Sequence, residues 1–191
     1  MKICGYVKNK NNIPIEDASI EIKNEHFETV YQTLSDNTGY YEISSEATTY
    51  PFLTAVKSYG VNFLEYWCQN IDLSKDVTLN LSFDRLEIYG LHVFSVKGSM
   101  PALMVYFRPM SLDKFKACET DISPEIEEIT VTIDNTKAEI YCQNKVNEFI
   151  GDRNVTSYLL QVSGTPGKWK FLSIEIKDTS GNYGKADIFN N

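Results

Sequence analysis

Apolar and polar residues alternate along much of the chain, in windows the length of a β-strand. The alternation is plainest in Ala18–Ile22, Val77–Leu81 and Glu128–Ile133. Because successive side chains of a strand point to opposite faces of a sheet, a period of two indicates strands with one buried face. Helical patterns are confined to Leu112–Ala117 and to one turn after Ser123, where a serine precedes a proline. The pattern therefore predicts an all-β fold.

Turn-forming residues separate these windows at short intervals. Examples are Asn11–Pro14, Asp36–Gly39, Asp134–Asn135, Gly164–Gly167 and Thr179–Asn182. Many short strands joined by such turns are typical of a β-sandwich or a β-barrel.

A boundary between two units is expected between Ser82 and Arg85, where one alternating strand ends and the next, Leu86–Tyr89, begins. We therefore expect two tandem antiparallel β-sandwiches, residues 1–83 and residues 84–191. No stretch rich in glycine, serine or proline separates them, so the two units are expected to abut with a fixed orientation.

The composition is that of a folded protein with an acidic surface. Of the 191 residues, 42% are hydrophobic and 23% are charged, close to ordinary globular usage. The 18 lysines and arginines stand against 26 acidic residues, which gives a net charge of -8, and no basic cluster is visible. Nucleic acid and acidic membrane surfaces are therefore unsuitable partners, because both require positive charge on the protein.

No apolar run approaches the roughly 20 residues of a membrane helix, so we expect no membrane span. No export leader precedes the first predicted strand, so the chain as written is expected to be cytoplasmic. An extracellular location is expected only if the chain is a trimmed piece of a longer protein.

Cysteine and histidine, on which metal sites and activated nucleophiles often depend, are sparse. The cysteines are widely separated in the sequence: Cys4, Cys68, Cys118 and Cys142. They form no C-x-x-C pair, so we expect buried free thiols. The only histidines, His26 and His92, lie in different predicted units without neighbouring ligand types. We therefore predict no metal site, no cofactor and no catalytic nucleophile.

Ten positions in the first half of the chain together form a recognisable sequence motif. These are Gly5, Val7, Pro14, Ala18, Ile20, Thr33, Ser35, Asp36, Gly39 and Tyr41. With them, about the first 80 residues resemble the carboxypeptidase regulatory-like domain, a transthyretin-like β-sandwich. The likeness is weaker at Thr48–Pro51, where that family usually has a P-P-G-x-Y element. The resemblance implies a non-catalytic unit that supports folding, links domains or mediates interaction, with no ligand common to the family.

The turn at Asp36 can also be understood from its residues alone. The Asp36 carboxylate can accept backbone N–H groups, and Gly39 can adopt the positive φ that a tight hairpin requires. Tyr41 and Ile43 are then expected to point inward. We interpret this turn as a determinant of the fold and not as a binding site.

The second half, in which we expect about seven strands, resembles a different sandwich. Its closing segments, Trp169–Ile176, Asp178–Asn182 and Ala186–Phe189, resemble the final hairpin of bacterial immunoglobulin-like or fibronectin-like domains. The Cys…Trp…Cys spacing of antibody domains is absent, so the resemblance implies architecture only. We interpret Asp178–Asn182 as a hairpin turn, because it lacks the glycine and the terminal glutamate of an EF-hand calcium loop.

Aromatic residues make up 13% of the chain, with 12 tyrosines and 2 tryptophans, and they allow two interpretations. Exposed rings stack on sugars while amides orient them. The candidate residues for such a site are Tyr66, Trp67, Gln69, Asn70 and Tyr40. Alternatively, the rings fill a core or the seam between the units, which we favour for Trp67 and Trp169. Neighbours on a strand face opposite ways, so Tyr66 and Trp67 can both be buried only if one faces the other unit.

Paired acidic residues give a third interpretation, a glycoside hydrolase with two carboxylates about 5 to 10 Å apart. The candidate pairs are Glu16–Asp17, Glu119 with Asp121, and Glu127–Glu128. In an acidic chain such pairs are usually solvated surface residues. We therefore favour a solvated surface over a catalytic site for all three pairs.

Our leading hypothesis is a non-catalytic, two-domain β-sandwich protein that acts as a structural or interaction module. A carbohydrate-binding module is the alternative, and a carboxylate-dependent glycoside hydrolase is a distant third. The expected partner is a protein or a carbohydrate.

Overall fold

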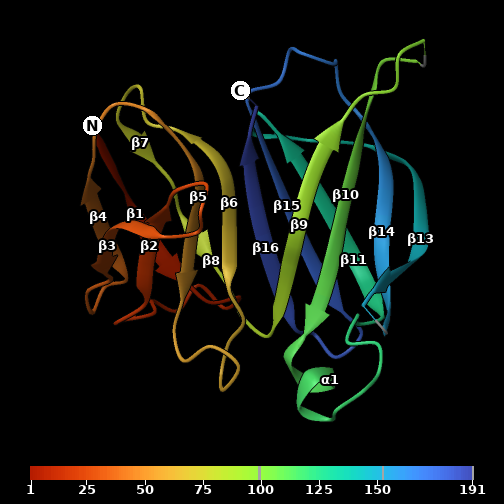
Figure 1. The fold of residues 1–191 in the computed structure, drawn as a ribbon, viewed down its shortest axis with the longest axis horizontal. Helices are drawn as coiled ribbons and strands as arrows, with labels where there is room; N and C mark the ends of the chain where they lie inside the picture. Colours follow the sequence, from red (N-terminus) through yellow and green to blue (C-terminus); the bar gives the residue numbers. More distant parts are fainter. Residues whose placement is uncertain (99, 152, 191) are drawn as a thin grey trace.

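Two hydrophobic cores, each enclosed by β-sheets, contain the buried apolar side chains (Figure 1). The computed structural model describes residues 1–98, 100–151 and 153–190. The first core draws on residues from Ile3 to Phe83, and the second on residues from Leu86 to Ile188. The prediction of an all-β sandwich fold is confirmed.

The first core lies inside the N-terminal sandwich. Its strands are β1 (Lys2–Lys8), β2 (Ser19–Lys23), β3 (Thr29–Leu34), β4 (Tyr40–Ser44), β5 (Thr49–Val56), β6 (Tyr66–Asp72), β7 (Val77–Thr78) and β8 (Leu81–Ser82). One sheet has the order β4-β1-β7, with β8 also pairing with β1, and β3-β2-β5-β6 lie opposite it. Buried residues alternate along β1, β2 and β4, as the period of two predicted.

The second core lies inside the C-terminal sandwich. Its strands are β9 (Leu86–Phe94), β10 (Ala102–Ser111), β11 (Ile126–Ile133), β12 (Thr136–Lys137), β13 (Ile140–Ile150), β14 (Arg153–Ser163), β15 (Phe171–Asp178) and β16 (Tyr183–Phe189). One sheet has the order β13-β14-β10-β9, and β12-β11-β15-β16 lie opposite it.

A single short helix, α1 (Leu112–Lys116), is present in the described part of the chain. The Ser111 hydroxyl caps it by accepting a hydrogen bond from the Lys114 backbone N–H. This is the first of the two predicted helical segments. The second, after Ser123, is wrong, because the chain stays extended there and enters β11 at Ile126.

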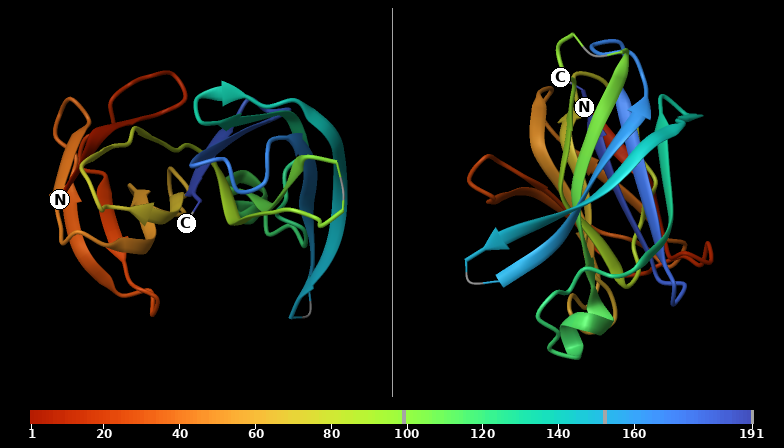
Figure 2. Two further views of the ribbon diagram at one scale, coloured as in Figure 1. Left: turned by 90° about the horizontal axis from the view of Figure 1, so that it is seen from above. Right: turned by 90° about the vertical axis from the view of Figure 1, so that its right-hand side faces the viewer.

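The two sandwiches share one sheet. Strand β6 pairs in parallel with β16, so the two half-sheets merge into one of eight strands with the order β12-β11-β15-β16-β6-β5-β2-β3. Figure 2 shows the sandwiches side by side along this joint. The pairs β1–β7 and β1–β8 are also parallel, which the purely antiparallel prediction did not include.

The shared sheet uses opposite faces for the two cores. In the parallel joint Trp67 is paired with Ala186 and Cys68 with Asp187, and paired residues point to the same side. Cys68 belongs to the first core, whereas Ala186 belongs to the second and Trp67 packs against it. The outer face of the N-terminal sandwich therefore continues as the inner face of the C-terminal sandwich.

Polar side chains connect the sandwiches beneath this joint. The buried Tyr66 hydroxyl donates a hydrogen bond to the fully buried carboxylate of Asp187. The Lys185 ammonium lies 3.2 Å from the same carboxylate and also donates to the Asn80 carbonyl oxygen. Burial and the nearby Asp187 charge raise the pKa of Tyr66 well above its ordinary value, so the phenol remains a donor. Asp187 Oδ2 is thus paired and hydrogen-bonded, whereas the buried Oδ1 has no hydrogen-bond partner among the described residues.

The predicted hairpin turns are present. Asp36 Oδ1 accepts hydrogen bonds from the backbone N–H groups of Thr38 at 2.8 Å and Tyr40 at 2.9 Å, and Gly39 has φ +78°. Asp178 Oδ1 likewise accepts from Ser180 and Asn182 within its own turn. Both aspartates are therefore used locally by the fold.

All four cysteines are free thiols, as predicted. Cys68 is buried and Cys4 is half-buried, but Cys118 and Cys142 are exposed, so the prediction of burial is wrong for these two. Cys118 lies just after α1 and Cys142 lies on the sheet-edge strand β13, where no second layer covers it.

Candidate functional site

A groove lies where the outer face of the N-terminal sandwich meets strand β9. Its volume is about 460 Å³, and its lining residues are Phe27, Phe52, Trp67, Gln69, Tyr89 and Gly90. This volume lies within the roughly 300 to 1,000 Å³ typical of ligand pockets. We refer to it as the aromatic groove.

The floor of the aromatic groove follows from the register of β5 and β6. Phe52 pairs with Gln69, and Thr54 with Trp67. Their neighbours Leu53 and Cys68 are fully buried in the first core. Because strand neighbours face opposite ways, Phe52, Gln69 and Trp67 point away from that core.

Trp67 is held between rings from both sandwiches. Its ring centroid lies 5.4 Å from that of Phe27, 6.2 Å from that of Phe52 and 5.6 Å from that of Tyr89. The Phe52 and Tyr89 rings stand nearly perpendicular to the indole, at 88° and 85°. The indole Nε1 donates a 2.9 Å hydrogen bond to Glu87 of β9. Its orientation is therefore fixed from both sides of the seam.

Phe27 reaches the groove from the turn between β2 and β3. Its backbone N–H donates to the Asn24 carbonyl oxygen at 3.0 Å, and its φ is +66°. A bulky residue rarely adopts a positive φ. The ring is nevertheless 46% exposed, and the Lys23 ammonium lies 5.3 Å from its centroid. This strained turn holds an exposed aromatic ring beside Trp67.

Tyr89 forms the wall of the groove because β9 is irregular there. The register between β9 and β10 shifts next to Gly90, which has φ +63°. Such a bulge re-aims a side chain. The Tyr89 ring is 43% exposed and contacts Trp67 across the seam.

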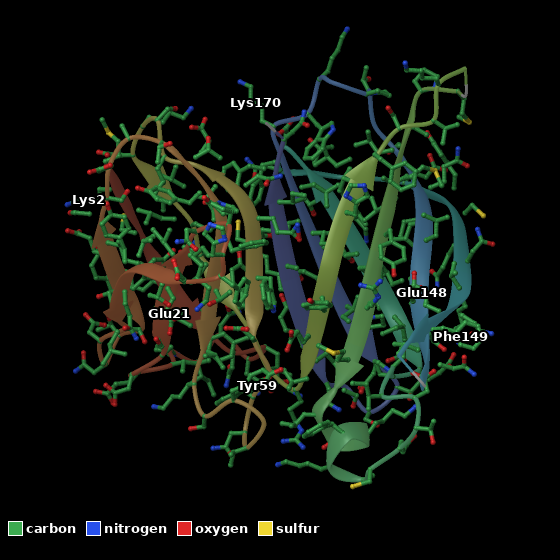
Figure 3. All side chains as sticks on the ribbon, in the orientation of Figure 1. Lys2, Glu21, Tyr59, Glu148, Phe149 and Lys170 are labelled. Carbon is green, nitrogen blue, oxygen red and sulfur yellow. The ribbon has the colours of Figure 1, made fainter. Side chains whose placement is uncertain are left out.

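Two acidic residues lie behind the aromatic groove. Glu87 is only 2% exposed and accepts hydrogen bonds from Trp67, from the Tyr59 hydroxyl at 3.3 Å and from the Glu65 backbone N–H at 3.3 Å. Figure 3 places Tyr59 at the lower end of the seam. Burial raises the pKa of Glu87 above its ordinary value.

The pKa of the Glu65 carboxyl is raised as well. Burial raises the pKa of the Glu65 carboxyl to about 7, against a hydrogen bond with Thr54, and the Glu87 carboxylate adds to the rise. Neither acid is among the lining residues of the groove. The sequence analysis identified neither acid as a candidate site residue. The only sequence signal for either was the position of Glu65, directly before the candidate segment Tyr66–Asn70.

The sequence-predicted site residues are not all brought together. Trp67 and Gln69 lie in the aromatic groove. Tyr66 is fully buried and offers no surface to a ligand. The Asn70 amide donates to the Phe189 carbonyl oxygen across the seam. Tyr40 lies on β4 in the opposite sheet, where its hydroxyl donates to Glu42.

Trp169 and the Gln69 side-chain amide also bear on whether the groove can bind a sugar. Trp169 is buried in the second core, so Trp67 is the tryptophan at the groove. Within the part of the chain that the structure describes, the Gln69 side chain makes no hydrogen bond. Trp67 is therefore partly exposed at the groove, whereas Trp169 and Tyr66 are buried.

The carboxylate pairs proposed for hydrolysis lie elsewhere. Glu16, Asp17, Glu127 and Glu128 are exposed. Glu119 forms an ion pair with Lys114. Asp121 accepts a 2.6 Å hydrogen bond from the Thr156 hydroxyl, and this and two backbone hydrogen bonds lower its pKa against the effect of burial.

Across residues 1–98, 100–151 and 153–190, no group of three or more His, Cys, Asp or Glu is placed to hold a metal ion. In the same residues, no helix is both long and apolar enough to span a membrane.

Comparison with known proteins gives no family for this chain. No family model and no curated protein matches it. Among solved structures it is similar to BcpA, the major pilin subunit of Bacillus cereus, at 12% identity and a TM-score of 0.34, covering 98% of this chain and 67% of BcpA. It is also similar to a DUF3823 family protein from Parabacteroides merdae, at 14% identity and a TM-score of 0.32, covering 95% and 90% of the two chains.

A third similar structure is SGBP-B of the Bacteroides ovatus mixed-linkage glucan utilization locus, in complex with a mixed-linkage heptasaccharide. It has 13% identity and a TM-score of 0.26, and the match covers 97% of this chain and 43% of that one. At such identities and TM-scores, none of these structures assigns an activity to this chain. The carboxypeptidase regulatory-like resemblance of the first half stays a prediction.

Proposed function

We propose that the protein is a non-catalytic, two-domain structural or interaction module that recognises its partner through the aromatic groove. The observation that carries the proposal is the composite origin of the groove. Phe27, Phe52 and Trp67 come from the N-terminal sandwich, and Tyr89 comes from the C-terminal one. The recognition surface therefore needs both sandwiches in a fixed arrangement.

The fixed arrangement is supported by the eight-stranded sheet and by the Tyr66–Asp187 contact beneath it. A pre-formed groove loses little conformational entropy on binding, which favours recognition by a rigid surface. A catalytic role finds less support, because the lining residues include no carboxylate. The nearby Glu87 is buried and already accepts three hydrogen bonds.

The two tryptophans provide a direct test. A mixed library of short peptides and oligosaccharides would be screened by NMR against the indole N–H signals, with the buried Trp169 as the internal control. We expect binders to shift the Trp67 signal and to leave the Trp169 signal in place. Binding that shifts neither signal, or release of hydrolysis products from the library, would overturn the proposal.

Carbohydrate binding is the second candidate function. The observation that favours it is that the exposed Phe27 and Tyr89 rings both contact Trp67 in a groove that the unbonded Gln69 amide also lines. Aromatic rings with an adjacent amide form a surface on which a sugar can both stack and donate or accept hydrogen bonds.

A further inference from the structure

We propose that the aromatic groove binds a neutral pyranose unit of an oligosaccharide. This inference rests on the proposed function, because it names the ligand class of the same groove. Three properties of the groove carry it: the charge of its lining, the arrangement of its rings and the state of its single amide.

Every side chain that lines the groove is uncharged, although the chain carries 26 acidic and 18 basic residues. The charged groups nearest the groove already have partners in the protein: Lys23 pairs with Glu21 at 2.5 Å, and Arg108, whose guanidinium lies beside Gly90, pairs with Glu148 at 2.7 Å. The buried Glu87 carboxyl accepts a hydrogen bond from the Trp67 indole. A charged ligand would be desolvated here without gaining a counter-charge. The lining is therefore complementary to a neutral ligand.

The rings offer apolar surface in two orientations. Trp67 and Tyr89 are 5.6 Å apart and nearly perpendicular, at 85°, so they form a floor and a wall. Phe27 adds a third ring, 5.4 Å from Trp67 and tilted by 31° to the indole. A pyranose has apolar C–H faces and a rim of hydroxyl groups, so it can lie against one ring while its edge contacts another.

The Gln69 amide distinguishes a sugar from an apolar peptide side chain. It lines the groove and makes no hydrogen bond within the described residues. An apolar ligand that covered it would leave a donor and an acceptor without partners, which costs about 1 to 3 kcal/mol. A sugar hydroxyl both donates and accepts, so it satisfies the amide when water is displaced.

The backbone on both sides of the groove supports the assignment to binding. Phe27 has φ +66° and Gly90 has φ +63°, and they come from different sandwiches. Each position presents or adjoins an exposed aromatic ring that lies outside both cores. Gly90 adopts this φ without cost, whereas the positive φ of Phe27 is unfavourable for a bulky side chain. The strained Phe27 backbone holds its ring beside Phe52 and Trp67 in the groove.

The inference is tested with neutral tetrasaccharides of glucose, mannose, galactose or xylose, and with an oligogalacturonate of equal length. Affinity would be measured by calorimetry and by the Trp67 indole signal, with the intact chain. We expect at least one neutral sugar to bind and to shift the Trp67 signal, and the oligogalacturonate to bind at least about tenfold more weakly. Equal or tighter binding of the uronate would overturn the inference.

Variants locate the binding. Tyr89→Ala and Gln69→Ala each remove one contact, and Phe27→Gly removes a ring while keeping a residue that tolerates positive φ. We expect losses of up to about tenfold in affinity for each ring, the upper value for one aromatic contact. Tyr40→Ala is the matched control, because Tyr40 is a partly exposed tyrosine on the opposite sheet. Equal losses for Tyr40→Ala and Tyr89→Ala would contradict the assignment.

Failure of this inference is distinguishable from failure of the proposed function. If peptides shift the Trp67 signal and no neutral sugar does, the sugar assignment fails and the groove remains the recognition surface. If neither class shifts it, both fail. Should Tyr89→Ala unfold the protein, Phe27→Gly provides the same measurement from the other side of the groove.

Discussion

At the scale of single residues, the Glu87 carboxylate organises the corner between the sandwiches. It accepts hydrogen bonds from Trp67 and Glu65 of the N-terminal sandwich and from Tyr59 of the loop before β6. The opposite orientations of Tyr66 and Trp67 could be predicted from strand alternation. The burial of Glu87 and Glu65 could not, because it arises from contact between β6 and β9, which are not paired and not adjacent in sequence.

The raised pKa of Glu65 predicts a pH dependence of stability. Its pKa rises from an ordinary value of 4.5 to about 7 in the folded protein, so the folded state binds the proton more tightly than the unfolded state. Folding stability from this group is fully present below about pH 4.5 and is lost as the pH rises through about 7. Glu65→Gln removes this loss. We expect the variant to gain about 1 to 2 kcal/mol over the wild type at about pH 8 and little at about pH 4.

Urea unfolding of both proteins at the two pH values measures the difference. The groups that face Glu65 are Glu87, Thr54, Lys23 and Glu21, and they are unchanged in the variant. Glu16→Gln, at an exposed position, serves as the control and should follow the wild type at both pH values. A constant difference between Glu65→Gln and the wild type across the range would contradict the prediction.

At the scale of elements, periodicity predicted the strands that have a buried face. It identified β2 and β11 and the short α1 at nearly their observed bounds. It missed most of β13, which has exposed side chains along nearly its whole described length and is held by backbone pairing with β14. Figure 2 shows this hairpin projecting from the C-terminal sandwich. Hydrophobic period reports burial, so a strand without a buried face leaves no such signal.

The close approach of β1 to the segment between β7 and β8 gives an element-scale prediction. A Cβ atom at the buried Gly5 would lie 2.0 Å from the Leu79 carbonyl oxygen, and the Leu79 backbone N–H already donates to Cys4. Gly5→Ala must push the two backbones apart, so we expect it to lower the free energy of unfolding by about 3 kcal/mol. Chemical denaturation measures this directly.

Gly164→Ala is the matched control for Gly5→Ala. Its Cβ would meet the Leu103 side chain at 2.9 Å, and not backbone. A side chain can move by changing rotamer, whereas the β1 backbone is fixed by its neighbours. If Gly5→Ala lowers the free energy of unfolding no more than Gly164→Ala does, the contact with the Leu79 backbone is not the cause of the destabilisation.

At the scale of the whole molecule, the missing spacer correctly led us to expect sandwiches that abut. The way in which they join could not be predicted. Residues 67–69 pair in parallel with residues 186–188, and pairing between segments so far apart in sequence has no local signature. The same joint positions the aromatic groove, because it makes one face of the N-terminal sandwich continuous with β16 and places Trp67 beside Tyr89.

The buried contact beneath this joint gives the molecule-scale prediction. Tyr66→Phe removes the hydroxyl that donates to Asp187, and it leaves the carboxylate with Lys185 as its charged partner. A hydrogen bond to a charged group contributes about 1.5 to 3 kcal/mol, so we expect a loss of that size in the free energy of unfolding. Because Asp187 lies in the β6–β16 ladder, amide hydrogen exchange at residues 186–188 should accelerate more than exchange in β14. Tyr6→Phe, at an exposed tyrosine, should change neither quantity. If the two variants are equally stable, the Tyr66–Asp187 contact does not hold the sandwiches together, and the β6–β16 pairing and the other contacts across the seam, such as Trp67 with Tyr89 and Glu87, must account for the joint.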